Sequence, residues 1–359
     1  MKNERSKKIN KNILNNVITI GIIIIFYAIC QIMIQTGSMS NLMKGLLVNL
    51  CYYSILAVSL NLTVGILGEL SLGHAGFMCV GAFTGAIFTQ CTVDIIPNTF
   101  IRFTLALLIG ALFAALFGML IGVAVLRLRG DYLAIVTLAF GEIIKNFINV
   151  LYIGLDGKGL HISIINTSLN LQDGGKVILK GAQGISGTPQ NATFTIAVIL
   201  LIIIYMIIVN LIKSRSGRAI MAIRDNRIAA ESVGIDITRF KLLAFSISAG
   251  MAGIAGVLYS HNISSLTASP KTFGYNQSIM ILVFVVLGGI GNIRGSIIAA
   301  VVLTLLPEYL RFLQDYRMLI YAIVLIVMMI FNWNPACIEW RKRHQIKNLF
   351  NQFSKKKEA

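Results

Sequence analysis

Charged residues are scarce in this sequence. They account for 13% of its 359 residues, whereas hydrophobic residues account for 56% and the mean hydropathy is +0.80. A soluble globule of this length needs far more polar side chains to cover its surface. The shortage therefore excludes a soluble globular protein and indicates an integral membrane protein.

The motifs of nucleotide hydrolysis and of common catalytic sites are missing too. There is no G-x-x-x-x-G-K-[ST] segment, so we expect no phosphate-binding loop and no ATP hydrolysis by this chain alone. There is no HExxH segment and no Ser-His-Asp order, and the four histidines are dispersed. The five cysteines are an odd number without a CxxC spacing, which argues against zinc or redox chemistry. We expect a protein that is not an enzyme and binds no metal or cofactor itself.

Acidic residues are few as well. The sequence has 14 Asp and Glu against 31 Lys and Arg, which gives a net charge of +17. Nucleic-acid-binding proteins share such a balance, but no aromatic-rich basic patch accompanies the cations here. The cations cluster at the ends of apolar segments, where membrane topology and anionic lipids explain them better. The expected partner is a lipid membrane, with no nucleic acid.

Long apolar segments are what the sequence has in place of charge. Some reach the roughly 20 residues that cross a bilayer, and others are shorter or interrupted. The longer ones are residues 17–34, 45–65, 103–126, 131–152, 194–212 and 241–260, and the shorter ones are 77–90, 276–290, 296–310 and 318–333. We predict an all-α, polytopic integral membrane protein with about ten (8–10) transmembrane helices, some of them broken by glycine.

The basic residues give the chain an orientation. The tails at residues 1–16 and 334–359 and the loop at 213–240 are basic, and the positive-inside rule places such segments in the cytoplasm. An even number of spans within residues 17–333 agrees, because it leaves both termini on one side. Residues 153–193 then form a polar, glycine-rich outer loop. It either caps the pathway or meets a binding protein, or it is a plain surface loop.

The polar island Lys213–Lys241 is the most informative stretch. It reads KSRSGRAIMAIRDNRIAAESVGIDITRFK, with seven cations against three acidic residues. No Pro or Gly occurs between Arg218 and Val233, and the small and apolar residues there fall near helical spacing. This pattern predicts a short amphipathic helix pair, broken near Gly234. Long inner loops are often basic and helical, so the charge alone leaves its role open.

Residues 229–234, AAESVG, resemble the AAxxxG core of the EAA loop of ABC importer permeases, the helix that docks into a groove on the ATPase subunit. Ile228 stands where that motif often has Glu, and the later Ile-x-Leu-Pro is absent. The resemblance implies an ATPase-coupling loop. Its candidate residues are Arg224, Asp225, Ala229, Ala230, Glu231 and Gly234.

Two glycine-rich breaks, Gly65–Gly76 and Gly288–Gly295, interrupt the apolar segments. Paired interruptions in the two halves of a chain point to a repeated transporter architecture. Glycine is also common in membrane helices because it lets backbones approach. The candidate residues for a translocation pathway are Gly68, Ser71, Gly73, His74, Glu142, Gly288, Gly289, Gly291 and Asn292.

Ionisable residues within the apolar segments are candidates for ion coupling. Glu142 and Lys145 are three apart on one helix face, and they either carry coupling or neutralise each other as a structural pair, which we favour. Glu69 and His74 lie in the first break, where irregular backbone must face protein or a watery cavity. For a lone histidine such as His74 we favour hydrogen-bonded packing over ligand binding.

Four stretches together resemble the branched-chain amino-acid ABC transporter permease family, and within it the LivM-type membrane subunits. They are GRAIMAIRDNRIAAESVGIDITRFKLLAFSISAGMAGIAGVLY, NLTVGILGELSLGHAGFMCVGAF, LRLRGDYLAIVTLAFGEI and VVLGGIGNIRGS. The resemblance implies the ABC importer permease fold and ATP-driven uptake of leucine, isoleucine and valine across the bacterial inner membrane. It also implies three kinds of protein partner: two cytosolic ATP-binding subunits that hydrolyse the ATP, a second, homologous permease, and an extracytoplasmic substrate-binding protein. The surroundings that it implies are a lipid membrane. The alternatives are the same scaffold for urea, amides, sugars or nucleosides, and a gradient-driven secondary transporter.

Overall fold

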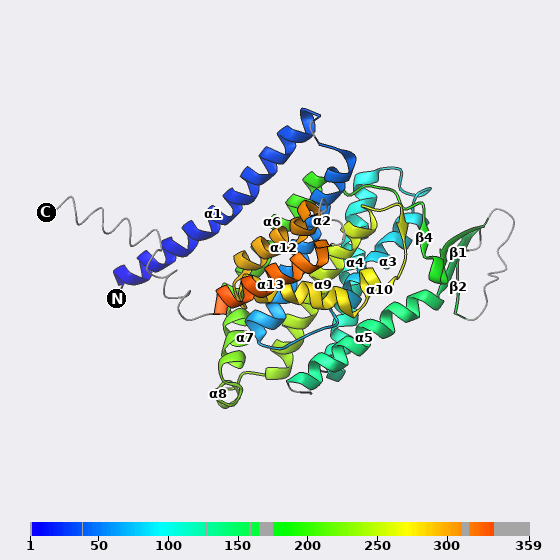
Figure 1. The fold of residues 1–359 in the computed structure, drawn as a ribbon. Coiled ribbons are helices and arrows are strands. Elements are labelled where there is room, and N and C mark those ends of the chain that lie inside the picture. The colour runs from blue at the N-terminus through cyan, green and yellow to red at the C-terminus, as the bar shows by residue number, and fades with distance from the viewer. Residues whose placement is uncertain are drawn as a thin grey trace. The chain divides into compact units, whose positions relative to one another are not determined.

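The computed structural model describes residues 2–37, 39–125, 128, 130–157, 159–164, 175–310 and 316–333, and the tail predicted at 334–359 lies outside them. Helices make up most of the described chain (Figure 1). The longer ones are α1 (Lys2–Gln35), α2 (Asn41–Asn61), α3 (His74–Cys91), α4 (Thr99–Val125), α5 (Asp131–Val150), α6 (Phe194–Lys213), α9 (Ile237–Ser260), α11 (Tyr275–Gly288), α12 (Ile293–Tyr309) and α13 (Arg317–Trp333). Because α1 begins at Lys2, residues 2–16 of the tail predicted at 1–16 are the first part of this helix.

The chain forms two compact units, residues 1–301 and 302–359. The second unit begins within α12 and contains α13. The first unit contains the helices α1 to α11, the polar island and both glycine-rich breaks. All features of the site described below therefore belong to one unit.

The core of the first unit lies where α3, α4 and α9 pack together. A Cβ atom added to Gly256 of α9 would lie 2.8 Å from the backbone nitrogen of Ala82 in α3. One added to Gly253 of α9 would lie 2.7 Å from the carbonyl oxygen of Gly110 in α4. Backbones this close exclude any side chain, and such contacts hold membrane helices together where apolar surroundings give no hydrophobic drive.

Seven helical segments among the described residues are long and apolar enough to cross a membrane: Val17–Gln35, Met43–Leu67, Thr99–Val125, Asp131–Val150, Phe194–Lys213, Ile237–Ser260 and Pro270–Gly288. They support a multi-pass helical membrane protein. The predicted number of ten is not confirmed. The helix α3 has 18 residues with polar ends, α12 and α13 have 17 each, and none of the three is among the seven.

A small β region accompanies the helices, so the protein is mainly rather than purely α-helical. β1 (Tyr152–Asp156) pairs antiparallel with β2 (Gly159–Ser163) and β3 (Lys176–Lys180), in the order β2-β1-β3. β4 (Ile185–Ser186) pairs with β5 (Ser265–Leu266). The loop predicted at 153–193 is thus partly a sheet, with residues 158 and 165–174 outside the described part. Its strands are too short for their apolar period to stand out in the sequence.

The polar island and this β region lie at opposite ends of α9. The helix α8 (Arg227–Ser232) comes directly before α9, and β5 comes after it. The 24 residues of α9 rise about 36 Å at 1.5 Å per residue, more than the roughly 30 Å of a hydrocarbon core. Figure 1 likewise shows α8 far from β1 and β2. The two polar regions therefore lie at opposite ends of a helix that is long enough to cross a membrane.

Candidate functional site

The polar island folds as two short helices, as the sequence predicted, but the break between them lies elsewhere. α7 (Arg215–Asp225) ends at Asn226, and the side chain of Asn226 then caps α8 by accepting a hydrogen bond from the backbone nitrogen of Ala229 at 3.0 Å. Gly234, with a φ of +82°, follows α8 and reverses the chain. Asparagine is a strong N-terminal cap, so the helix pair divides there, and glycine supplies the left-handed residue that ends it.

One face of the helix pair packs onto the rest of the first unit. Ile220 of α7 is buried in a cluster with Leu62 and Leu67. Ala230 of α8 is 3% exposed and packs with Ile223 and Ile237. Ala230 was predicted to be in a solvent-facing docking surface, and the structure places it on the inner face instead. Because this methyl group is buried against two isoleucines, a larger side chain at this position would disturb the packing of α8.

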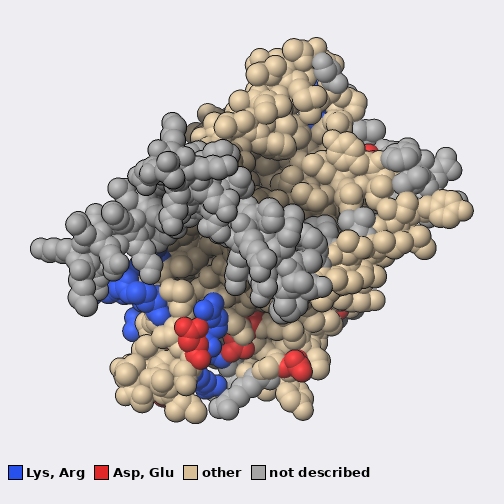
Figure 2. Space-filling view, turned by 60° about the vertical axis from the view of Figure 1, so that its left-hand side comes forward, with Lys and Arg blue, Asp and Glu red and all other residues tan. Residues whose placement is uncertain are grey.

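The other face of the pair is exposed. Five of the six predicted coupling residues are exposed there: Arg224, Asp225, Ala229, Glu231 and Gly234. Beside them, Ile228 and Val233 are 80% and 74% exposed. Figure 2 shows charged side chains gathered toward the lower end of the molecule, the level of α7 and α8 in Figure 1, while the remaining described surface in view is mostly uncharged. Two large apolar side chains exposed within a charged region are a typical feature of a protein-binding surface.

The Arg224 side chain is 38% exposed, and its guanidinium reaches from this helix pair to the first glycine-rich break. Its Nη1 donates a hydrogen bond at 2.9 Å to the carbonyl oxygen of Gly65, and its Nε and Nη2 donate to Asp225 Oδ1 at 3.2 and 3.0 Å. Gly65 belongs to a π-helical turn, η1 (Leu62–Leu67), which continues α2 and ends at Gly68 with a φ of +80°. The coupling-loop candidate Arg224 and the pathway candidate Gly68 are therefore neighbours: a Cβ on Gly68 would lie 2.6 Å from Arg224 Cγ.

A second charged contact holds the same end of η1. The Lys241 ammonium, on the first turns of α9, forms an ion pair with the Glu69 carboxylate, and the two side chains are 4% and 17% exposed. Burying a charge is costly unless a partner neutralises it. Glu69 is thereby fixed to α9, and residues 65–69 are held by one cation from α7 and one from α9.

Asn61 joins the two glycine-rich breaks. This fully buried residue precedes η1, and its Nδ2 donates to Ser296 Oγ at 2.7 Å. Its Oδ1 accepts from the backbone nitrogen of Gly291 at 2.8 Å. Gly291 has a φ of +81° and approaches Gly65 so closely that a Cβ on Gly291 would lie 3.4 Å from the Gly65 carbonyl oxygen. The breaks predicted as a pair thus meet in space.

The remaining candidates of the first break are packed inside the protein. His74 is 2% exposed, and its Nε2 lies 2.7 Å from Ser59 Oγ, which is the hydrogen-bonded packing favoured from the sequence. Gly73 abuts the backbone of Thr137 in α5. Ser71 is also buried, and its hydroxyl has no hydrogen-bond partner among the described residues. None of these three residues lines the described pocket that contains Gly291 and Asn292 of the second break.

Glu142 has two structural partners. Its carboxylate forms an ion pair with Lys145 and accepts a hydrogen bond from the backbone nitrogen of Tyr275 at 2.8 Å. The geometry is that of the structural pair favoured from the sequence, and it ties α5 to the start of α11.

In the second break, Gly288 packs against Gly295, Gly289 has a φ of +97°, and the side chain of Asn292 caps α12 by accepting a hydrogen bond from Gly295 N at 3.3 Å.

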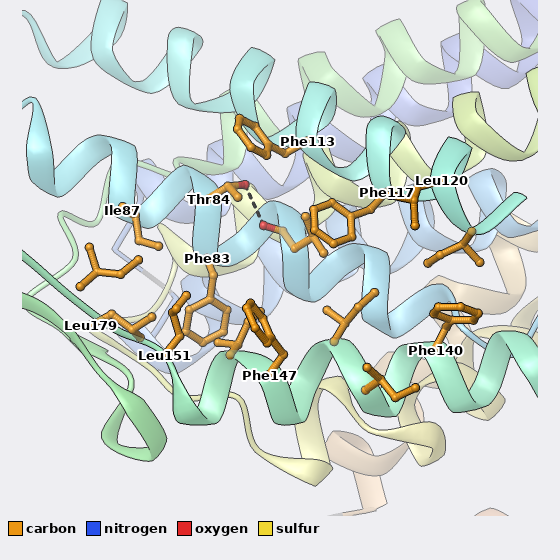
Figure 3. Close-up of a pocket in the computed structure, with 16 residues that line it drawn as sticks. Phe83, Thr84, Ile87, Phe113, Phe117, Leu120, Phe140, Phe147, Leu151 and Leu179 are labelled. Atoms are coloured by element: carbon orange, nitrogen blue, oxygen red, sulfur yellow. Dashed lines mark hydrogen bonds between the residues drawn. The ribbon is translucent and has the colours of Figure 1, made fainter. Parts of the chain in front are cut away.

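An apolar cavity in the described part of the chain is chemically unlike a site for a charged metabolite. It has a volume of about 470 Å³ and lies between α3, α4 and α5. Figure 3 shows its lining of aromatic and aliphatic side chains, including Phe83, Phe113 and Phe147, and the one hydroxyl there, that of Thr84, is bonded to the backbone of Val80. Such a wall offers contacts to hydrocarbon and no partner for an ammonium or carboxylate group. Among the described residues, no group of His, Cys, Asp and Glu is placed to hold a metal ion.

Sequence reasoning missed the buried polar residues that assemble this site. Asn61, Ser296 and Thr137 lie in apolar segments, and Thr137 Oγ1 accepts a hydrogen bond from Leu72 N at 3.0 Å. The only signal is their polarity at membrane depth, where unpaired polar groups are costly. Their partners are as far as 235 positions away in the chain, so the pairs themselves are invisible in the sequence.

Comparison with known proteins gives consistent matches. A family model described as the permease component of branched-chain amino acid transport systems matches residues 42–329. The high-affinity branched-chain amino acid transport system permease proteins LivM of Salmonella typhimurium and of Escherichia coli K12 are each 35% identical over 305 residues, 82% of this chain and 69% of theirs. The fructose import permease protein FruG of Bifidobacterium longum is 24% identical over 306 residues, 83% of this chain and 84% of its own. No solved structure matches.

Proposed function

The chain belongs to the family of permease components of branched-chain amino acid transport systems, and from that premise we propose that it is the membrane-spanning subunit of an ATP-driven ABC importer for leucine, isoleucine and valine. It is a multi-pass protein of the bacterial inner membrane. The higher identity to the two LivM proteins than to the fructose permease favours amino acids over sugars. The same scaffold serving a sugar is the second candidate, because that fructose permease is similar over most of both chains.

The partners follow from the class of transporter. Two cytosolic ATP-binding subunits hydrolyse ATP, a second, homologous permease completes the pathway, and an extracytoplasmic binding protein delivers the substrate. Within this proposal α3, α12 and α13 also span the membrane, which makes ten spans with both termini cytoplasmic. The apolar lining of the described cavity, whose one hydroxyl is bonded to the backbone of Val80, supports a pathway that forms between two permeases rather than inside one.

The exposed face of α7 and α8 is the observation that carries the proposal. It presents Ile228 and Val233 within a charged surface, at the end of α9 opposite to the sheet. The inner face is seated on η1 and α9 through Ile220 and Ala230. A partner that binds the exposed face can therefore move a rigid pair of helices that is attached to the membrane core. Alternating access then results from a population shift between two arrangements of these elements.

Replacing Ile228 by glutamate tests this docking surface. A buried apolar anchor typically contributes more than 1 kcal/mol to an interface, and burying an unpaired carboxylate adds a further penalty. We expect the ATP-binding subunits that co-purify with the permease to fall about tenfold, which corresponds to 1.4 kcal/mol. The measurement is their amount per permease after affinity purification of the complex from membranes.

Ile95→Glu is the matched control. Ile95 is 76% exposed and follows α3 at the end away from α7 and α8. It should retain a normal amount of the ATP-binding subunits, because the added charge lies on the opposite face. Normal retention in Ile228→Glu, or an equal loss in both variants, would remove the docking assignment.

A further inference from the structure

Near the end of the π-helical turn η1, the carbonyl group of Gly65 accepts its hydrogen bond from a side chain outside the turn. Residues after the turn bond back to Thr63: both Gly68 N and Glu69 N donate to its carbonyl oxygen, the latter at 3.0 Å. The Gly65 carbonyl accepts from Arg224 Nη1. The C-terminal end of a helix carries partial negative charge and unpaired carbonyls, so a guanidinium is a well-matched cap for it. Here the cap comes from a residue 159 positions away.

We propose that Arg224 and Lys241 act together as a cation clamp on residues 65–69, and that this clamp transmits movement of the α7–α8 pair to the membrane core. The inference rests on the proposed function, since it names the residues through which ATPase docking reaches the pathway. Arg224 and Lys241 are positioning residues: neither needs to touch the substrate. Motion of α7 pulls directly on the end of η1, in addition to any motion passed along the chain into α9.

The elements on both sides of the clamp are suited to transmission. On the outer side, Ile220 packs α7 directly against Leu62 and Leu67 of η1. The inner side is a π-helical turn, a form that recurs at functional sites because its backbone pairing is less favourable than that of an α-helix. Returning such a turn to α-helical pairing shifts the register by one residue, which rotates the residues after the turn by about 100°. Asn61, at the start of η1, extends any such change to Gly291 and Ser296.

Gly68 provides a way to disturb the clamp from the opposite side. A methyl group at Gly68 would lie 2.6 Å from Arg224 Cγ, so Gly68→Ala must displace the arginine stem. Its φ of +80° adds backbone strain to any L-residue. Gly37 has a φ of +71° and no heavy atom within 4 Å of an added Cβ. Gly37→Ala therefore carries similar backbone strain without a steric contact, and it is the matched control.

The test is a double-mutant cycle on the complete transporter in proteoliposomes, with the ratio of ATP hydrolysed to leucine taken up as the readout. We expect Arg224→Ala and Gly68→Ala each to raise this ratio about tenfold, within the usual range of coupling between sites. The double variant should be no worse than Arg224→Ala, since the alanine removes the Cγ atom that Gly68→Ala displaces. Arg224→Lys, which keeps one donor and the charge, should recover part of the coupling. Glu69→Gln, which leaves Lys241 without its counter-ion, should also raise the ratio, and Gly37→Ala should not.

Several outcomes would overturn the clamp. An unchanged ratio in Arg224→Ala would do so, as would multiplicative effects of the two changes in the double variant. A lower yield of Arg224→Ala complex with a normal ratio would show that the residue only stabilises the fold. If Arg224→Ala yields no complex, Arg224→Lys and Glu69→Gln carry the test, and normal ratios in both reject the clamp. Leucine uptake by the unaltered transporter that needs no ATP would reject the proposed function instead, so the two failures are distinguishable.

Discussion

Gly256→Leu is expected to remove most of the folded protein from the membrane. An added Cβ at this position would lie 2.8 Å from the backbone nitrogen of Ala82 and 3.0 Å from the carbonyl carbon of Met78. These atoms belong to the backbone of α3, so neither can turn aside as a side chain would, and α9 must separate from α3. Overpacking a core typically costs about 1–3 kcal/mol and occasionally more, and we expect the upper end here. The measurement is the amount of monodisperse protein recovered in detergent, together with its melting temperature.

Gly21→Leu is the control for this variant. Gly21 lies in α1, and an added Cβ there has no heavy atom within 4 Å. Leucine also has the higher helix propensity, so its yield and melting temperature should equal or exceed those of the unaltered protein. Equal recovery of both variants would show that α3 and α9 do not depend on this close backbone contact.

Asn61→Leu is expected to reduce leucine uptake about tenfold and to lower stability by about 1–3 kcal/mol, the cost of leaving buried polar groups unpaired. The leucine side chain occupies a similar space but removes both hydrogen bonds that join residue 61, just before the first break, to Gly291 and Ser296. The two breaks then have no polar link at this point. Uptake by proteoliposomes and thermal unfolding of the purified complex measure the two effects separately.

Two further variants test whether the loss of leucine uptake comes from the two hydrogen bonds of Asn61. Ser296→Ala removes one of the two bonds and should give an intermediate loss of uptake. Thr84→Val removes a hydroxyl whose bonds remain within α3, and it should leave uptake within about twofold, since measured membrane hydrogen bonds average about 0.6 kcal/mol. If Asn61→Leu transports normally, contact between the breaks has no role in transport.

The features that depend on composition and local pattern could be predicted from the sequence. Few charged residues and long apolar segments indicate a helical membrane protein, and this conclusion does not depend on tertiary contacts. The positions of the cations along the chain indicate the polar island. The helix pair was predicted because α7 and α8 carry the pattern of an amphipathic helix within a few residues. The pairing of Glu142 with Lys145 was predicted for the same reason, since the two residues lie one helical turn apart.

The features that depend on distant contacts could not be predicted in this way. Ala230 has the same local pattern whether its methyl group faces a partner or faces Ile223 and Ile237, and only the fold decides that it faces inward. Likewise Arg224 resembles any cation of an inner loop until the fold brings Gly65 beside it. The number of membrane-spanning helices is also hard to predict from the sequence, because the polar ends of α3 shorten its apolar part.

ATP-dependent uptake is the most direct measurement of the central claim. The complete transporter, with the two ATP-binding subunits, the second permease and the binding protein, is reconstituted into proteoliposomes with ATP on the side of the ATP-binding subunits. Labelled leucine should accumulate against its gradient with ATP, and not with a non-hydrolysable analogue, and an ionophore that collapses proton and sodium gradients should have no effect. Accumulation that persists without ATP and disappears with the ionophore would contradict the account and identify a gradient-driven transporter.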